Sequence, residues 1–209
     1  MKTAPETRAS AELSAEEATR LLDIAREALY AATRGDEMWR PALEELPERL
    51  CQPGATFVTL YTRGELHGCI GSIEPRLPLA HDVAKNAISA ARRDPRFPLL
   101  RADEIDDTEI EISLLSPLQE VPYRDVEDLL TKIRPGEEGV LVERGWQRGL
   151  LLPQVWEKIS DPREFLGHVA LKAHATPAIY EDPDTRVYTF RVTSYTQPAP
   201  AEQHTAGRS

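Results

Sequence analysis

The strand expected over residues 66–73 constrains the fold of this chain more than any other stretch, because Gly68 and Gly71 stand on either side of Cys69. Glycine inside a strand costs conformational entropy and leaves a gap in the packed face. We therefore expect either a bend in this strand or a close approach of another group to its backbone. An Arg-Gly pair just before it is typical of a turn, which makes the strand the second arm of a β-hairpin.

The same succession of hairpin, alanine-bearing helix and single strand occurs twice along the chain. The first copy begins near Phe57 and the second near Val140. Strands that pair through hairpins favour antiparallel order, so the pattern predicts an α+β fold with a mainly antiparallel sheet and an internal repeat of hairpin–helix–strand units. The spacings that match between the two hairpins are Gly64 to Cys69 and Gly145 to Leu150.

Capping residues mark where helices begin. Ser14 and Glu17 form a capping-box pattern, and Asp161 followed by Pro162 marks a later start. The last strand is expected as one element over residues 185–195. The expected organisation is a disordered lead-in over 1–13, one compact domain over 14–196 with similar halves over about 55–118 and 138–196, and a disordered tail over 197–209.

Charge and composition narrow the possible partners. The net charge of −10 argues against broad contact with phosphates, so nucleic acid is not expected as a partner. Apolar runs are broken well before the roughly 18 to 20 residues of a membrane span, and neither an anchor nor a signal peptide is predicted. Cys51 and Cys69 are too few for a disulfide framework, so we expect reduced thiols and a cytoplasmic protein.

Three motifs follow one another along the chain: Leu-His-Gly-Cys-Ile-Gly over 66–71, Asp-Pro-Arg-Phe over 94–97, and Pro-Gln-Val-Trp-Glu over 153–157. In this order they resemble the AMMECR-one domain family, whose bacterial members are called AmmeMemoRadiSam system protein A. The resemblance implies an α+β fold with an internal repeat, and a gene neighbourhood shared with a Memo-like protein and a radical SAM protein, which are the expected partners. It implies no settled reaction, since members have been suggested to be cysteine enzymes or regulators of transcription or translation.

Two positions depart from the family pattern. The family usually has arginine where this chain has His67, so an anion-clamping guanidinium is not expected there. The family tends to read Lys-Ala-Gly where this chain has Lys172, Ala173 and His174. We expect His174 to take the helix C-cap place of that glycine, or to interact with the carbonyls at the helix end.

Cys69 is the main catalytic candidate. In the functional hypothesis it is a nucleophile supported by nearby backbone N–H groups, with His67 on the same strand face as its base. In the alternative it is a small buried packing residue, as free cysteine often is. His67 and Cys69 also form a His-x-Cys pair, but no further ligand follows at a suitable spacing, so no metal site is predicted.

Other residues complete the expected site. Glu74 is a second candidate proton carrier. Arg96 either anchors an anionic substrate or fixes its own loop. Gly68 and Gly71 would let a substrate approach the backbone, and Gln154 would line the same cleft if the two repeats faced each other. The neighbouring tryptophan of the third motif is expected to be ordinary core.

The leading functional hypothesis is a cytoplasmic accessory component or a thiol-dependent enzyme with an unknown substrate, acting with Memo-like and radical SAM partners. One rival is a non-catalytic interaction module, in which the glycine-rich strand lets a partner come close. The other is an RNA-binding regulatory factor, which the acidic composition disfavours. Neither a P-loop nor a dinucleotide-binding glycine pattern occurs, so no cofactor is assigned.

Overall fold

The computed structural model describes residues 12–200 of the chain. The predicted disordered lead-in and tail therefore lie mostly outside the described residues. Within the described part, Leu13 is buried and its backbone N–H donates a hydrogen bond to the Tyr195 hydroxyl at 2.7 Å. The chain divides into two compact units, with borders after Leu115 and after Val192.

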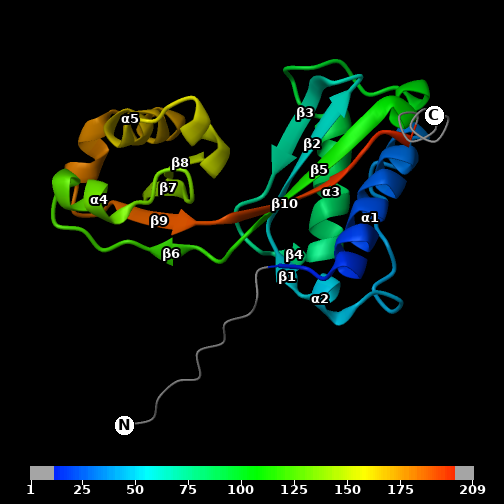
Figure 1. The fold of residues 1–209 in the computed structure, drawn as a ribbon, viewed down its shortest axis with the longest axis horizontal. Coiled ribbons are helices and arrows are strands. Elements are labelled where there is room, and N and C mark those ends of the chain that lie inside the picture. The colour runs from blue at the N-terminus through cyan, green and yellow to red at the C-terminus, as the bar shows by residue number, and fades with distance from the viewer. Residues whose placement is uncertain (1–11, 201–209) are drawn as a thin grey trace, which may run out of the picture. The chain divides into compact units, whose positions relative to one another are not determined.

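The first unit is built on an antiparallel four-stranded sheet in the order β10-β5-β2-β3 (Figure 1). Its strands are β2 (Thr56–Thr62), β3 (Glu65–Gly71), β5 (Thr108–Leu115) and β10 (Val192–Gln197). Burial alternates along β2, because Val58 and Leu60 face the core while Phe57, Thr59 and Tyr61 are only half-buried. One face of the sheet is thus packed, and the other carries mixed polar and aromatic side chains.

Helices cover the packed face of this sheet (Figure 1). The helices of the unit are α1 (Ala15–Thr33), α2 (Glu48–Cys51), α3 (Leu79–Arg92) and the 3-10 helix η1 (Ala102–Asp107). The predicted capping box is present: Ser14 accepts from the Glu17 N–H and the Glu17 carboxylate accepts from the Ser14 N–H. The short strands β1 (Pro53–Gly54) and β4 (Leu77–Pro78) pair where the chain enters α3.

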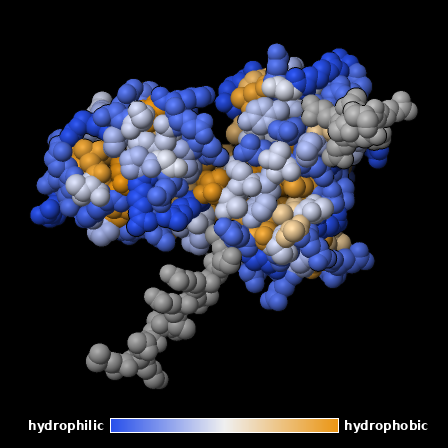
Figure 2. All heavy atoms as spheres, in the orientation of Figure 1, coloured by the Kyte–Doolittle hydropathy of each residue, from blue (hydrophilic) through white to orange (hydrophobic). Residues whose placement is uncertain are grey.

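The second unit has its own antiparallel sheet, in the order β6-β9-β7-β8. Its strands are β6 (Gln119–Glu120), β7 (Gly139–Arg144), β8 (Gln147–Leu151) and β9 (Arg186–Phe190). Its helices are α4 (Val126–Lys132), α5 (Pro162–Lys172) and the 3-10 helices η2 (Pro153–Glu157) and η3 (Pro177–Glu181). Asp161 caps α5 as predicted, accepting a hydrogen bond from the Glu164 N–H at 2.8 Å. Figure 2 shows hydrophilic residues over much of the visible surface.

The two units repeat one topology, which confirms the predicted α+β fold and the internal repeat. In each, a hairpin precedes a helix, and the next long strand pairs with the first arm of the hairpin: β5 with β2, and β9 with β7. The matched hairpin positions also behave alike. A Cβ on Gly68 would lie 2.3 Å from the Ala90 carbonyl oxygen of α3, and a Cβ on Gly149 would lie 2.3 Å from the Val169 carbonyl oxygen of α5.

The prediction of one final strand over residues 185–195 was wrong. The structure has two strands there, separated at Arg191: β9 in the sheet of the second unit and β10 in the sheet of the first. Alternation of apolar residues predicts that a segment is extended, but it does not say which sheet each part joins. Val187 packs in one core, whereas Tyr195 packs against the other.

Candidate functional site at Cys69

Cys69 lies on β3, which is an edge strand of the first sheet. Its partner on β2 is Thr59. Along this hairpin Leu60 pairs with Gly68, but the next residue, Tyr61, pairs with Leu66. One residue of β3, His67, is therefore left over as a β-bulge directly before the cysteine peptide. Bulges bend a strand and re-aim its side chains, and they occur often beside active sites.

The outward-facing backbone groups of Cys69 are bound by two side chains from the loop after α3. The Cys69 N–H donates to Asp94 Oδ2 at 2.9 Å, and Arg96 Nη2 donates to the Cys69 carbonyl oxygen at 3.2 Å. Arg96 in turn donates three hydrogen bonds to the Asp94 carboxylate: Nε to Oδ1 at 2.9 Å, Nη2 to Oδ2 at 2.7 Å, and its backbone N–H to Oδ1 at 3.2 Å. The loop therefore closes the sheet edge at the cysteine, where an edge strand would otherwise expose unpaired groups.

The two side chains of this ion pair differ strongly in their exposure to solvent. The Asp94 side chain is only 1% exposed, whereas that of Arg96 is 57% exposed. The Arg96 guanidinium, followed by the N–H groups of Cys69 and Arg96, holds the pKa of the Asp94 carboxyl well below its usual range, against the opposing effect of burial. Both groups are consequently charged at neutral pH, and the open side of the guanidinium faces solvent next to the cysteine peptide.

The thiol itself has polar neighbours on the open face of the sheet. Thr59 Oγ1 donates a hydrogen bond to Cys69 Sγ at 3.4 Å. Burial raises the pKa of the Tyr61 phenol, and the charges of Glu111, Cys69 and Glu109 raise it further. Tyr61 is thus a protonated group within electrostatic reach of the thiol. Sequence analysis missed both β2 residues, because only the bulge brings Thr59 opposite Cys69.

The two predicted proton carriers lie in different surroundings. The bulge interrupts the alternation from which the sequence placed His67 on the same face as Cys69, and that placement stays a prediction. His67 Nε2 is shielded from solvent and, within residues 12–200, forms no hydrogen bond. Glu74 pairs with the Arg76 guanidinium, whose Nε donates a hydrogen bond to Glu74 Oε2 at 2.5 Å. Neither arrangement tests a catalytic role, and both roles stay predictions.

The glycines of the motif have a packing explanation. A Cβ on Gly68 would strike the α3 backbone, and a Cβ on Gly71 would lie 2.3 Å from the ring of Phe57. The close approach expected from the sequence is therefore made by parts of the same unit. Substrate contact at either glycine remains a prediction beyond this packing role.

A buried polar cluster holds the segment that follows β3. The carboxylate of Asp82, on α3, accepts hydrogen bonds from Thr56 N–H at 2.9 Å, Thr56 Oγ1 at 2.8 Å, Ser72 Oγ at 2.5 Å and Asn86 Nδ2 at 3.0 Å. Burial raises the pKa of Asp82, and the Ser72 and Thr56 donors, together with the charge of Lys85, oppose that shift. Sequence analysis did not single out this cluster. A polar pair four residues apart within an alanine-rich helix was the signal available.

In the second unit, Trp156 is ordinary core, as predicted. Its ring stacks on Phe165 with 3.7 Å between centroids, and its Nε1 donates to the Glu138 carbonyl oxygen at 2.7 Å. Gln154 is exposed on η2. The proposed shared cleft for Gln154 and Cys69, which belong to different units, stays a prediction.

His174 takes the position expected of a glycine cap. Its φ is +53°, and α5 ends in a Schellman motif, with His174 N–H bonded to Leu171 O at 3.0 Å and Ala175 N–H to Ala170 O at 3.0 Å. This confirms the prediction made from the missing glycine. A left-handed conformation is unfavourable for any residue with a Cβ.

We expect His174→Gly to stabilise the protein by about 0.5–1 kcal/mol, because glycine adopts this conformation without a steric cost. Urea unfolding followed by circular dichroism measures the change. Lys172→Gly, in the last helical turn, is the matched control and should destabilise by about the same amount. A loss of stability in His174→Gly would show that the imidazole makes a contact that outweighs the strain.

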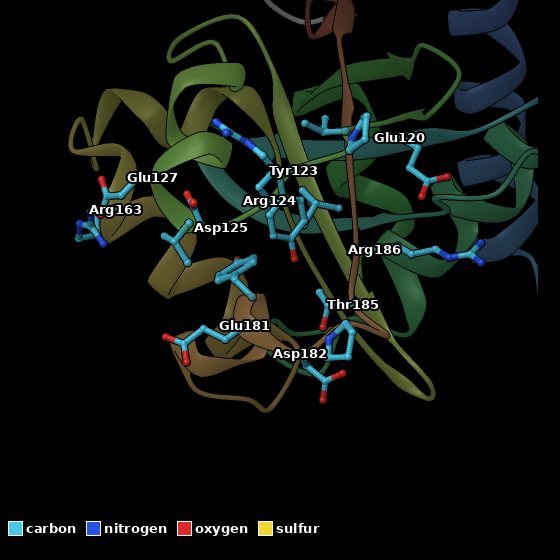
Figure 3. A pocket seen from close by; sticks show the side chains of 16 residues that line it. Glu120, Tyr123, Arg124, Asp125, Glu127, Arg163, Glu181, Asp182, Thr185 and Arg186 are labelled. Carbon is cyan, nitrogen blue, oxygen red and sulfur yellow. Dashed lines mark hydrogen bonds and ion pairs between the residues drawn. The ribbon is translucent and has the colours of Figure 1, made fainter.

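The second unit also has a hollow of about 850 Å³ between β6, β9 and the loops beside α4 and η3. Figure 3 shows Glu127 beside Arg163 on one side, Glu120 and Arg186 on another, and Tyr123 between them. Tyr180 also lines the hollow, and its buried hydroxyl donates to the Leu166 carbonyl oxygen at 2.8 Å, which holds this side chain in place. Its rim carries both signs of charge and shows no single chemical preference.

Among residues 12–200, no group of three or more His, Cys, Asp or Glu side chains is arranged to hold a metal ion. Over the same residues, no helix combines the length and apolar character needed to cross a membrane.

The fold and the site define an α+β protein of two repeated units, with a cysteine clamped at a bulged sheet edge. The chain belongs to the AMMECR1 family, whose model matches residues 22–195. A protein of Methanothermobacter thermautotrophicus is 43% identical over 182 residues, covering 87% of this chain and 94% of that protein. A protein of Thermotoga maritima is 43% identical over 156 residues, covering 73% and 83% respectively. The crystal structure of an uncharacterised protein from Pyrococcus horikoshii matches with a TM-score of 0.81 and 33% identity, covering 90% of this chain and 95% of that one.

Proposed function

We propose that this AMMECR1-family chain is a thiol-dependent accessory protein in which Cys69 reacts with an anionic, electrophilic substrate. The observation that carries the proposal is the double clamp on the cysteine peptide. Asp94 and Arg96 bind its N–H and its carbonyl oxygen, so the thiol is held at a defined place on the open sheet face. A fixed nucleophile lowers the entropic cost of reaching a transition state.

Arg96 supplies the preference for an anion. Two of its nitrogens serve Asp94, and Nη1 forms no hydrogen bond within the described residues. Because the side chain is more than half exposed, that nitrogen can bind a substrate carboxylate or phosphate beside the thiol.

The chemical step follows from these roles. A base, for which His67 and Glu74 are the candidates, takes the proton of the Cys69 thiol. The Sγ–C bond forms to the electrophilic carbon, the bond from that carbon to the leaving group breaks, and the leaving group departs with the same proton. Tyr61, which stays protonated, stabilises the negative charge that develops in between.

The proposed context is the cytoplasm, with a Memo-like protein and a radical SAM protein as partners. The support for these partners is the resemblance of the three sequence motifs to the AmmeMemoRadiSam system protein A group. The rival function, a non-catalytic interaction module, draws its support from the exposure of the edge strand that carries Leu66.

Alkylation of the native protein tests the proposal. We expect Cys69 to react with iodoacetamide at least about tenfold faster than Cys51 near neutral pH, because only Cys69 is held on an open face beside hydrogen-bond donors. Cys51 is an internal standard whose thiol donates to the Leu43 carbonyl oxygen at 3.4 Å. Labels are located by mass spectrometry.

The preference of the Cys69 site for anions is tested by comparing two alkylating reagents of different charge. Iodoacetate is anionic and iodoacetamide neutral, so the ratio of their rates at Cys69 should be higher than at Cys51, and Arg96→Gln should lower it about fivefold. The control is Arg101→Gln, since Arg101 also pairs with an aspartate two residues away through Nε and Nη2. Labelling of Cys69 only after denaturation would contradict the proposal and favour the interaction module, for which copurification with the two partners is the next test.

A further inference from the structure

We propose that the first unit has a second binding site, for a small aromatic anion, in a pocket of about 320 Å³ beside Trp39. We call it the Trp39 pocket. It is formed by the segment after α1, with Trp39 and Arg40, and by the face of α3 that carries His81, Lys85 and Ile88. These three α3 residues lie on one face because they are spaced by four and three positions. The volume suits a ligand of one or two rings.

The apolar part of the pocket is packed against the core of the first unit. Trp39 is half-buried and packs against the core of the first unit, and Ile88 is 2% exposed. Leu77, from the short strand β4, lies in the wall as well. An indole ring packed on the core and aliphatic walls favour a flat, apolar ligand body. Met38, 70% exposed at the opening, is a flexible apolar side chain that can fold over such a body.

The charged part of the pocket is positive, in a chain whose net charge is −10. Arg40, Lys85 and Arg93 line it, against the single acid Glu37. The Glu37 carboxylate is already bonded to two arginines, since Arg93 donates to it at 3.1 Å and Arg92 at 3.4 Å. Within residues 12–200, Arg40 and Lys85 form no ion pair.

The acid closest in sequence to Lys85 interacts with it electrostatically, but the two groups form no ion pair among the described residues. Asp82 lies on α3, but its carboxylate is buried and bonded to Thr56, Ser72 and Asn86. His81 is also occupied, because its Nε2 lies 3.0 Å from the Pro41 carbonyl oxygen. Two cations without an ion pair among residues 12–200 thus lie beside an aromatic wall, which is the combination that recognises a ring bearing a carboxylate, sulfonate or phosphate.

The test uses the fluorescent aromatic sulfonate anilinonaphthalene sulfonate, and its neutral relative phenylnaphthylamine, with the full chain. We expect the sulfonate to bind at one site. The double variant Arg40→Gln/Lys85→Gln should weaken it about fivefold to tenfold while changing the neutral dye less than twofold. The matched control, Arg163→Gln/Lys172→Gln, removes one arginine and one lysine from the second unit and should leave both affinities unchanged.

Competition then identifies the anionic group. Displacement of the dye by phenyl phosphate but not by benzoate would assign a phosphate ligand, and the reverse would assign a carboxylate; either outcome supports the proposal. Trp39→Leu should weaken both dyes, with circular dichroism to verify folding. Equal loss of sulfonate binding in the two double variants, no loss in Arg40→Gln/Lys85→Gln, or full displacement by inorganic phosphate alone would overturn it.

Discussion

Gly68→Ala is expected to destabilise the protein by about 3 kcal/mol or more, because the new methyl group has no room against the backbone of α3. Its Cβ would lie 2.3 Å from the Ala90 carbonyl oxygen and 3.0 Å from the Ala90 carbonyl carbon. The obstacle is main chain, so no side-chain rotation can relieve it, and either β3 or α3 must shift. The same shift would displace the peptide of Cys69.

Urea unfolding by circular dichroism measures this loss, and Gly167→Ala is its matched control. Gly167 lies within α5, and a Cβ there would meet nothing within 4 Å. The same substitution should therefore stabilise the protein by up to about 1 kcal/mol through helix propensity. The repeat predicts that Gly149→Ala behaves like Gly68→Ala, since its Cβ meets the Val169 carbonyl oxygen of α5. A small effect at Gly68 would mean that strand and helix separate easily, and the packing explanation of the glycine would fail.

Most of the fold could be predicted from patterns of residues that are close together in the sequence. The capping box at Ser14, the hairpin turn before β3 and the proline start of α5 each depend on neighbouring residues only, and all three are present. The internal repeat was also readable, because hairpin, helix and strand follow in the same order twice and the spacing from Gly64 to Cys69 matches that from Gly145 to Leu150. His174 shows how a missing glycine predicts a strained cap as clearly as a present one predicts a relaxed one.

The details of the site were less accessible, because they depend on pairing over longer distances. A bulge at His67 changes which residue faces Cys69, and no local pattern marks that insertion. The clamp joins Cys69 to Asp94 and Arg96 across the whole of α3. The motif at 94–97 predicted a turn, but the peptide that this turn binds could be identified only once β3 was placed at the sheet edge.

The two buried aspartates of the first unit should give pH dependences of opposite sign. Arg96 lowers the folded-state pKa of Asp94, so its ionisation stabilises the fold above the unfolded pKa of about 3.9, and this contribution is lost as pH falls toward the folded value. The cost of Asp94→Asn, about 2 kcal/mol near neutral pH, should therefore shrink as pH falls below about 4.

Burial raises the folded-state pKa of Asp82, so the contribution of its titration is complete below about pH 3.9 and is lost as pH rises through the folded value. The cost of Asp82→Asn should accordingly shrink as pH rises above about 4. Both variants replace one carboxylate oxygen by an NH2 group and keep the shape of the side chain, so each serves as the control for the other. The measurement is the free energy of unfolding in urea from about pH 2.5 to 7. If both costs change in the same direction, the four donors around Asp82 outweigh its burial, and Asp82, like Asp94, is held as an anion that fixes the chain after β3.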